Sequence, residues 1–210
     1  MVIIIGNQKG GSGKSTLTMM LANFLSKVKN CTVTVIDMDY QQSISQKYEK
    51  AKILENQEPY EVIAASLEDY PAMETTIIEN PDDIVLIDLP GKLDDDGLIG
   101  VFKSANLVIC PFSYDEFTFE STVFFSLVLR KINPEVSILY VPNRIKANVK
   151  YEIQTDVDEQ LTNFGKVSAP IPDRIDLQRV NTFLTPLSVY PVVRPVFEQI
   201  YSAYIKKDHE

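Results

Sequence analysis

Short, continuous runs of apolar and β-branched residues recur along this chain and alternate with stretches of helical periodicity. The runs lie at 2–6, 32–37, 83–90, 106–112, 136–143 and 166–172. Strands that are apolar at every position are typical of a sheet covered on both faces. The intervening helices are expected at 14–29, 41–54, 95–103, 116–132, 151–163 and 194–207. The alternation predicts an α/β fold with a doubly wound, mainly parallel sheet and helices on both faces.

The stretch 56–80 is less regular. Within it, "YEVIAAS" (60–66) predicts a short strand and "PAMETTIIEN" (71–80) predicts a helix. No internal repeat and no low-complexity linker divides the 210 residues. We therefore expect one domain over 1–210, with its ligand beyond the carboxyl ends of the strands.

The composition is that of a soluble protein, with 45 % hydrophobic and 23 % charged residues. No apolar run approaches the roughly 20 residues of a membrane span. The two cysteines, Cys31 and Cys110, lie in or beside strand-like runs and are expected to be reduced thiols. These features predict a cytoplasmic protein.

A glycine-rich segment, "GNQKGGSGKST" (6–16), joins the first apolar run to the first helix. It fails the strict Walker A pattern at Gln8 but fits the variant K-G-G-x-G-K-[ST] at 9–15. Such a loop turns its backbone N–H groups toward a phosphate, and the helix that follows adds its positive end. The predicted nucleotide contacts are Gly10, Gly11, Ser12, Gly13, Lys14, Ser15 and Thr16, with Lys14 on the β- and γ-phosphates and Ser15 also on Mg²⁺.

The segment "KGGSGKST" resembles the deviant Walker A motif of the ParA/MinD group of P-loop ATPases, and the chain is most similar to the small ParA-type partitioning ATPases. The resemblance implies that ATP and Mg²⁺ are the ligands. It also implies that Lys9, the additional lysine, crosses a dimer interface to the phosphates held by the partner subunit. ATP binding and homodimer formation would then be one event.

Two carboxylates follow the second apolar run in "VIDMDYQQS", at Asp37 and Asp39. The family pattern here is close to D-x-D-P-Q. The resemblance implies that Asp39 orients the attacking water and that Asp37 holds Mg²⁺ through water. Tyr40 replaces the usual proline, so the conformation of this loop is left open.

A third carboxylate, Asp88, follows four apolar residues in "DIVLIDLPG", a Walker B-like arrangement that aims it at the metal. Gly91 lies in the segment that resembles the family's second switch. Each of these acids could also be an ordinary cap or turn residue.

In "YVPNR", Asn143 and Arg144 follow a strand. The resemblance implies that Asn143 hydrogen-bonds adenine, and that Pro172 and Asp173, in a segment like the family's I-P-x-R, close over the base. An ordinary loop asparagine is the alternative.

Charge is unevenly distributed, although the net charge is −9. Residues 1–142 hold 11 Lys and Arg against 20 Asp and Glu, whereas residues 143–207 hold 9 against 7. Family members that partition DNA bind it non-specifically through basic residues, and the resemblance implies five candidate contacts here: Arg144, Lys146, Lys150, Arg174 and Arg179. The alternative is that these are scattered solubilising charges. A DNA-bound form would be associated with the nucleoid.

The segment "VFEQIYSAYIKK" places Phe197, Ile200, Tyr201, Tyr204 and Ile205 on one helical face. Only two lysines follow, and Asp208 and Glu210 come after them. We expect this face to pack on the sheet and not to bind a membrane.

The resemblance favours a ParA-like ATPase that forms an ATP-dependent sandwich dimer, binds DNA non-specifically and segregates plasmid, mobile-element or chromosomal DNA. Hydrolysis would be slow until stimulated by a ParB-like, centromere-binding partner. A MinD-like positioning ATPase and a nucleotide-gated scaffold for a membrane or protein cargo are the alternatives.

Overall fold

The structure, a computed structural model, describes residues 1–52, 57–80, 82–92 and 94–206, with the backbone alone at Ile78. Eight parallel strands in these residues form the sheet β3-β2-β4-β1-β5-β6-β7, and β8 also pairs with β6. They are β1 Val2–Ile5, β2 Val33–Asp37, β3 Glu61–Ala64, β4 Ile84–Asp88, β5 Leu107–Phe112, β6 Ser137–Ile145, β7 Lys166–Val167 and β8 Ile171–Pro172. The predicted fold class is confirmed.

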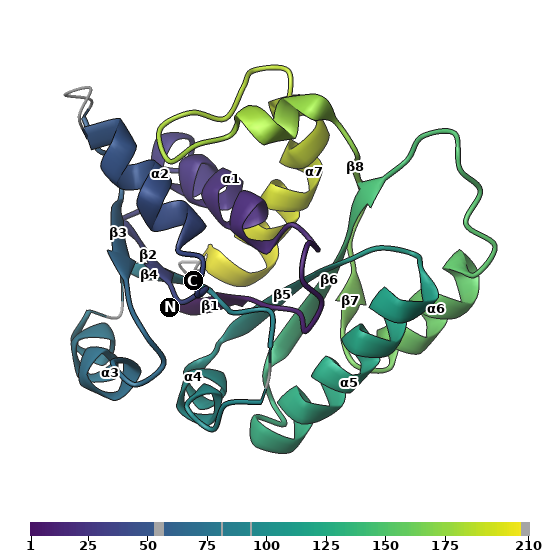
Figure 1. The fold of residues 1–210 in the computed structure, drawn as a ribbon, viewed down its shortest axis with the longest axis horizontal. Helices are drawn as coiled ribbons and strands as arrows, with labels where there is room; N and C mark the ends of the chain where they lie inside the picture. Colours follow the sequence, from purple (N-terminus) through teal and green to yellow (C-terminus); the bar gives the residue numbers. More distant parts are fainter. Residues whose placement is uncertain (53–56, 81, 93, 207–210) are drawn as a thin grey trace.

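Helices cover both faces of the sheet (Figure 1). One layer contains α1 Lys14–Lys27, α2 Ser43–Lys52 and α7 Tyr190–Ile200. The other contains α3 Tyr70–Glu79, α4 Leu98–Ser104, α5 Glu116–Ile132 and α6 Gln154–Thr162. The short helical segments η1 (Ile175–Arg179) and η2 (Tyr201–Ile205) flank α7 in the sequence.

The side chains of β1 point alternately to the two faces of the sheet, so the hydrophobic core has two parts. Ile3 and Ile5 pack with residues of α1 and α7, whereas Val2 and Ile4 pack with residues of α4 and α5. All four residues are buried. This two-sided burial explains why the strands are apolar at every position.

The strand register brings the acidic residues to one edge of the sheet. Asp37 of β2 lies opposite Asp88 of β4, and Asp88 lies opposite Ile5, the last residue of β1. The glycine-rich loop leaves β1 immediately beyond this point. Because parallel strands end at the same edge, residues far apart in the sequence meet here.

Several sequence predictions need correction. Helix α4 begins at Leu98, not 95, and α6 begins at Gln154, not 151. The run 166–172 is two short strands, β7 and β8, because the segment between them contains Pro170, which has no N–H to donate. The last helix begins at Tyr190, not 194, since Pro191 fits the first turn of a helix. Helix α2 begins at Ser43, two residues later than expected, after a turn closed by Gln42 N–H on the Asp39 carbonyl. Residues 53–54, which the sequence placed in this helix, lie outside the described residues.

The C-terminal apolar face packs on the sheet, as expected. Phe197 and Ile200 are fully buried, and Tyr201, Tyr204 and Ile205 pack partly buried against the same cluster. The rings of Phe197 and Phe24 of α1 lie 5.5 Å apart. Among the described residues, no helix combines the length and apolarity needed to cross a membrane.

Replacing Phe197 with alanine should destabilise the fold by about 3–5 kcal/mol, because it leaves a cavity beneath α7. Urea denaturation would measure this. The control is Leu187→Ala, whose side chain is 84 % exposed and whose loss should cost less than about 0.5 kcal/mol. Equal effects of the two substitutions would contradict the packed tail.

Candidate nucleotide-binding site

The glycine-rich loop has a backbone that only glycine adopts readily at two positions. Gly11 has φ +79° and Gly13 has φ +90°, both left-handed. A Cβ at Gly13 would also lie 2.3 Å from the Asn143 amide nitrogen, whereas one at Gly11 or Gly10 would meet no atom within 4 Å. Gly13 therefore has both a conformational and a steric reason to be glycine.

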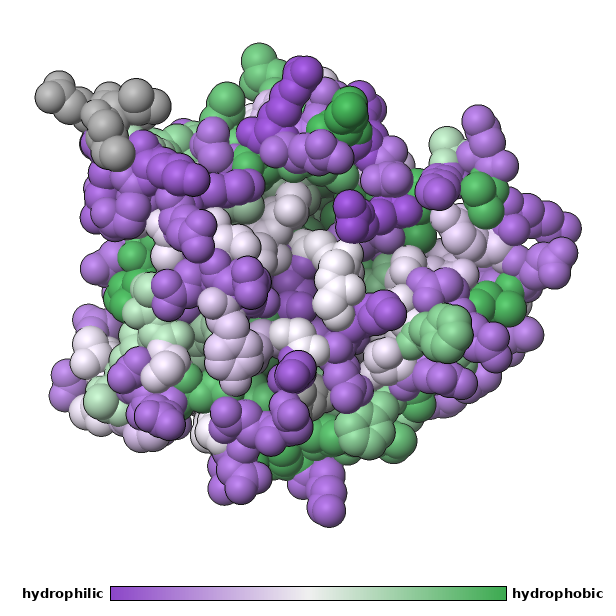
Figure 2. Space-filling view, viewed as in Figure 1, coloured by the Kyte–Doolittle hydropathy of each residue, from purple (hydrophilic) through white to green (hydrophobic). Residues whose placement is uncertain are grey.

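A cleft of about 560 Å³ lies beside this loop and holds most of the predicted nucleotide residues. Figure 2 shows a hollow near the middle of this face, bordered by neutral and hydrophilic side chains. The lining includes Gly10, Gly11, Gly13, Lys14, Ser15, Thr16, Asp39, Gly91, Asn143, Arg144 and Asp173. Ser12, Pro172 and Lys9 are not part of the lining.

The carboxylate of Asp88 is joined to the first turns of α1. Ser15 Oγ donates to its Oδ2 at 2.6 Å, and Thr18 Oγ1 lies 3.3 Å from its Oδ1. Thr18 also donates to the Lys14 carbonyl at 3.0 Å. The predicted metal pair Ser15 and Asp88 is thus already in contact.

Asp37 is fully buried and holds the start of α2. Its Oδ2 accepts from the backbone N–H of Ile44 at 3.1 Å and from the N–H and hydroxyl of Ser45 at 2.9 and 3.0 Å. Its Oδ1 is buried and has no hydrogen-bond partner among the described residues. One carboxylate oxygen of Asp37 therefore caps the start of α2, and the other oxygen is left for another ligand.

Burial raises the pKa of Asp88 to about 7. The Ser15 hydrogen bond and the Lys14 charge lower it, whereas the charges of Asp37 and Asp39 raise it. A cation beside Asp88 would favour the charged form of this carboxylate.

The described residues fit a hard cation such as Mg²⁺. The site offers a hydroxyl, a carboxylate of raised pKa and an unpartnered carboxylate oxygen, from Ser15, Asp88 and Asp37. Oxygen donors of this kind suit Mg²⁺, which keeps several of its own waters.

Asp39 lies at the rim of the cleft. Its Oδ1 accepts the backbone N–H of Gln41 at 2.9 Å, which forms a tight turn, and Gln42 has φ +46°. Tyr40, at the position of the family's proline, is 71 % exposed. The turn thus forms without a proline because the aspartate side chain closes it.

The two lysines of the motif lie in different surroundings. Lys14 is 6 % exposed and lines the cleft, whereas Lys9 is exposed at the mouth of the loop. Lys9 makes no ion pair within 4 Å among the residues that the structure describes.

Residues at the carboxyl end of β6 contact the loop directly, because the strand continues to Ile145, two residues beyond the predicted run. Asn143 donates to the Ser12 carbonyl at 2.8 Å, and Arg144, in a left-handed conformation with φ +60°, donates to the Gly11 carbonyl at 2.9 Å. Asp173 of the I-P-x-R-like segment lines the same cleft. Both predicted base-side segments therefore reach the loop region.

The structure does not bring the five candidate DNA contacts together. Arg144 and Arg174 line the nucleotide cleft, and Arg174 and Arg179 both approach Asp176, at 3.3 and 3.9 Å. Lys146 and Lys150 are exposed on the loop between β6 and α6.

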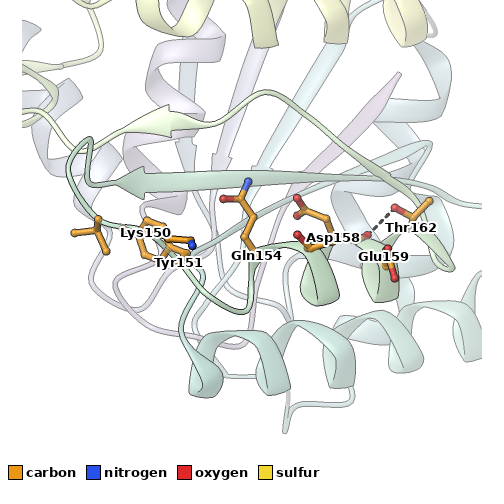
Figure 3. A pocket seen from close by; sticks show the side chains of 8 residues that line it. Lys150, Tyr151, Gln154, Asp158, Glu159 and Thr162 are labelled. Atoms are coloured by element: carbon orange, nitrogen blue, oxygen red, sulfur yellow. Dashed lines mark hydrogen bonds between the residues drawn. The ribbon is translucent and has the colours of Figure 1, made fainter.

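A second hollow of about 620 Å³ lies beside α6 and is lined by Lys150, Tyr151, Gln154, Asp158 and neighbours (Figure 3). Asp158 accepts a hydrogen bond from the hydroxyl of Tyr114, which lies 2.9 and 3.2 Å from the two carboxylate oxygens of Asp158. This hollow has no glycine-rich loop and contains none of the predicted phosphate residues.

Some residues of the site were not predicted from the sequence. Lys47 of α2 lines the cleft and donates to the Val180 carbonyl at 3.0 Å. Asn7 is buried beneath the loop and bonds to three neighbours. Asn7 directly follows the β1 run and Gly6, a position that could have singled it out, whereas no local pattern distinguishes Lys47.

The fold, the loop and the acids define a P-loop nucleotide-binding domain. Residues 3–186 match the CobQ/CobB/MinD/ParA nucleotide binding domain family, and the chain belongs to this family. The family resemblance inferred from the sequence is thereby confirmed. A search of curated proteins found no match.

Solved structures share the fold. A putative plasmid partition protein from Borrelia burgdorferi B31 bound to AMPPNP is 24 % identical, with TM-score 0.75 over 96 % of this chain and 98 % of that one. The Pyrococcus furiosus cell division ATPase MinD is 18 % identical, with TM-score 0.74 over 96 % and 98 %. The ATP complex of a Cyanothece McdA variant is 16 % identical, with TM-score 0.73 over 100 % and 98 %.

Alanine substitutions at the three loop glycines should separate conformation from packing. Gly10→Ala should be nearly neutral for stability, and Gly11→Ala should cost about 1–2 kcal/mol for the left-handed backbone. Gly13→Ala should cost about 1–3 kcal/mol more, because its methyl group meets Asn143. Chemical denaturation without nucleotide measures the series, and equal losses at Gly11 and Gly13 would contradict the Asn143 contact.

Asp88→Asn should stabilise the nucleotide-free protein in a pH-dependent way. Asp88 ionises near pH 3.8 when unfolded and near 7 when folded, so the wild type loses stability as the pH rises through this window. The asparagine does not titrate. The variant's advantage should be absent below pH about 4, grow to pH about 7 and then level off on the order of 2–4 kcal/mol.

Urea denaturation in the presence of EDTA, at intervals from pH 4 to 8, measures this difference. Asp158→Asn is the control, because Asp158 is an acid remote from the cleft. A pH-independent difference between Asp88→Asn and the wild type would show that Asp88 is not held protonated.

Proposed function

We propose that this protein is a ParA-like partitioning ATPase that forms a sandwich dimer around ATP and Mg²⁺ and uses it to bind DNA. The observation that carries the proposal is the separation of the two lysines. Lys14 is buried in the cleft, and Lys9 is exposed outside it with no ion pair among the described residues. An exposed lysine at the mouth that does not line its own cleft supports a contact with the nucleotide of a second subunit.

Binding relies on the loop and on β6. The loop N–H groups and Lys14 receive the phosphates, and Thr16 adds a hydroxyl contact. Asn143 lies beside the loop with its amide nitrogen on Ser12, so its oxygen can accept from the amino group of adenine. Asp173, which lines the cleft, would close its base side together with Pro172, which precedes it in β8.

Hydrolysis relies on charge and positioning. Ser15, Asp88 and Asp37 would hold Mg²⁺, which would supply positive charge to neutralise the phosphates. Asp39 at the rim orients the attacking water. Lys9 of the partner subunit adds positive charge at the γ-phosphate, so that a monomer hydrolyses slowly and a dimer, further stimulated by a ParB-like protein, faster.

Two observations bear on the cargo. The apolar face of the C-terminal tail is packed against the core, which removes the reason to propose a membrane. Of the five candidates, Lys146 and Lys150 are the two that neither line the cleft nor approach Asp176, and they are exposed on the loop beside α6, where they could contact a DNA backbone. A dimer would present two copies of this loop, so that DNA binding would depend on the nucleotide that forms the dimer.

The test is DNA binding at low and moderate salt with ADP, with ATP, and with ATP in the Asp39→Ala variant, alongside the oligomeric state by light scattering. We expect ATP-dependent dimers that bind DNA in a salt-sensitive way and persist in Asp39→Ala, because the variant binds ATP without hydrolysing it. Lys9→Ala should bind ATP as a monomer and not dimerise.

Two results would contradict the proposal at different points. If dimers form with ATP but never bind DNA, the proposed cargo would be a protein and not DNA, and the proposal of an ATP-gated dimer would stand. A Lys9→Ala variant that dimerises like the wild type would overturn the role of Lys9. Lys47→Ala is the control for a general loss of cleft structure, since Lys47 lines the cleft away from the loop mouth.

A further inference from the structure

We infer that Asn7 is a positioning residue that fixes the backbone of Lys9, so that the exposed lysine is presented to a second subunit. This inference deepens the proposed function and rests on it for its consequence. Its structural basis is a set of three hydrogen bonds made by one amide that is 1 % exposed.

The bonds of Asn7 connect three separate elements. Its amide nitrogen donates to the Pro111 carbonyl of β5 and to Thr122 Oγ1 of α5, both at 2.9 Å. Its amide oxygen accepts the backbone N–H of Lys9 at 3.2 Å. The Asn7 side chain therefore attaches the mouth of the loop to β5 and α5, and this attachment does not require a bound phosphate.

The chemistry of the partners fixes which way the amide faces. The Pro111 carbonyl can only accept, and Thr122 already donates its hydroxyl proton to the Thr118 carbonyl at 2.7 Å. Both therefore require a donor, which only the amide NH₂ supplies. The oxygen must then face the backbone N–H of Lys9, which is a donor.

The residue before Asn7 is also held closely against its surroundings. The preceding residue is held by Gly6 N–H on the Ile109 carbonyl at 3.1 Å. A Cβ at Gly6 would lie 2.9 Å from the ring of Phe125, so α5 packs directly on the start of the loop. Losing one bond in so closely packed a place leaves a buried polar group unpaired.

The acidic residue that interacts with the charge of Lys9 belongs to the same helix, α5. Asp115 is the N-cap of α5, and its Oδ1 accepts the Thr118 N–H at 2.9 Å. Burial raises the pKa of Asp115, but hydrogen bonds from Ser113 and Thr118 and the charge of Lys9 outweigh it, so the pKa lies below its ordinary value. The charge of Lys9 thus acts on Asp115 of α5, the helix that is bonded to Asn7, and Lys9 does not line its own cleft.

The substitution Asn7→Asp isolates this role. It keeps the shape of the side chain but replaces the donor NH₂ with a carboxylate oxygen that faces the Pro111 carbonyl and an occupied hydroxyl. The Lys9 segment should then be released while Lys14 and the rest of the loop keep their structure.

The first readout is tryptic cleavage after Lys9 in the nucleotide-free protein, which needs no dimer. We expect Asn7→Asp to be cleaved about tenfold faster than the wild type at this bond, the effect of losing an anchoring hydrogen bond. Cleavage after Lys27 and Lys103 in helices is the internal control and should be unchanged. Equal rates at Lys9 in variant and wild type would overturn the inference.

The second readout separates presentation of Lys9 from nucleotide binding. Asn7→Asp should bind a fluorescent ATP analogue as a monomer within about threefold of the wild type, yet fail to dimerise, as Lys9→Ala does. Equal loss of both properties would indicate general damage and would overturn a role through Lys9. A wild type that does not dimerise with ATP would sink the proposed function, while the cleavage rates would still decide whether Asn7 positions Lys9.

A second variant keeps the test decisive if Asn7→Asp does not fold. Thr122→Val removes one acceptor of the Asn7 amide, and Thr122→Ser retains it. We expect faster cleavage after Lys9 in Thr122→Val alone, by about threefold. The same rate in the valine and serine variants would contradict the anchor.

Discussion

Burial of β1 on both faces is the constraint on which the rest of this structure depends. Its four residues pack against helices on either side, and its neighbours β4 and β5 hold its edges. The strand therefore has one position and one direction. Everything that leaves its carboxyl end, the loop and the start of α1, is fixed relative to the acids on one side and β6 on the other.

The two sides of β1 contribute different chemistry. Toward β4 and β2 lie Asp88 and Asp37, buried and opposite each other, which makes this side costly to hold without a cation. Toward β5 and β6 lie amides and carbonyls, with Asn143 and Arg144 on the loop backbone. The phosphate loop thus lies between a side that carries carboxylates and a side that carries an amide and a guanidinium group.

Hydrogen bonds hold the segments that border the cleft. Asp37 holds the start of α2, and the Asp39 turn immediately precedes that helix. Asn7 holds the mouth of the loop to β5 and α5. Short hydrogen bonds therefore connect the loop and the start of α2 to the neighbouring elements of the sheet.

Local pattern was enough for much of the architecture. Continuous apolar runs predicted the sheet, and α5 was predicted with its observed bounds because Asp115 caps it and its apolar periodicity is clear. Prediction failed where local signals conflict with tertiary packing: in 166–172, where Pro170 interrupts a run that looked uniform, and at Tyr190, where a proline begins a helix instead of excluding one.

The sequence by itself determined the fold class, the phosphate loop and the identities of the acids after strands, since these depend on periodicity and on spacing along the chain. Only the tertiary structure decided that Asp37 divides its carboxylate between a helix cap and an open oxygen, that Arg174 lines the cleft, and that Asn7 supports Lys9. The support of Lys9 depends on contacts between residues about 100 apart in the chain, such as Asn7 and Pro111, and even the short-range bond between Asp37 and Ser45 requires both residues to be buried at the edge of the sheet. No local pattern encodes them, because the partner of a buried polar group is set by which elements the whole sheet brings together.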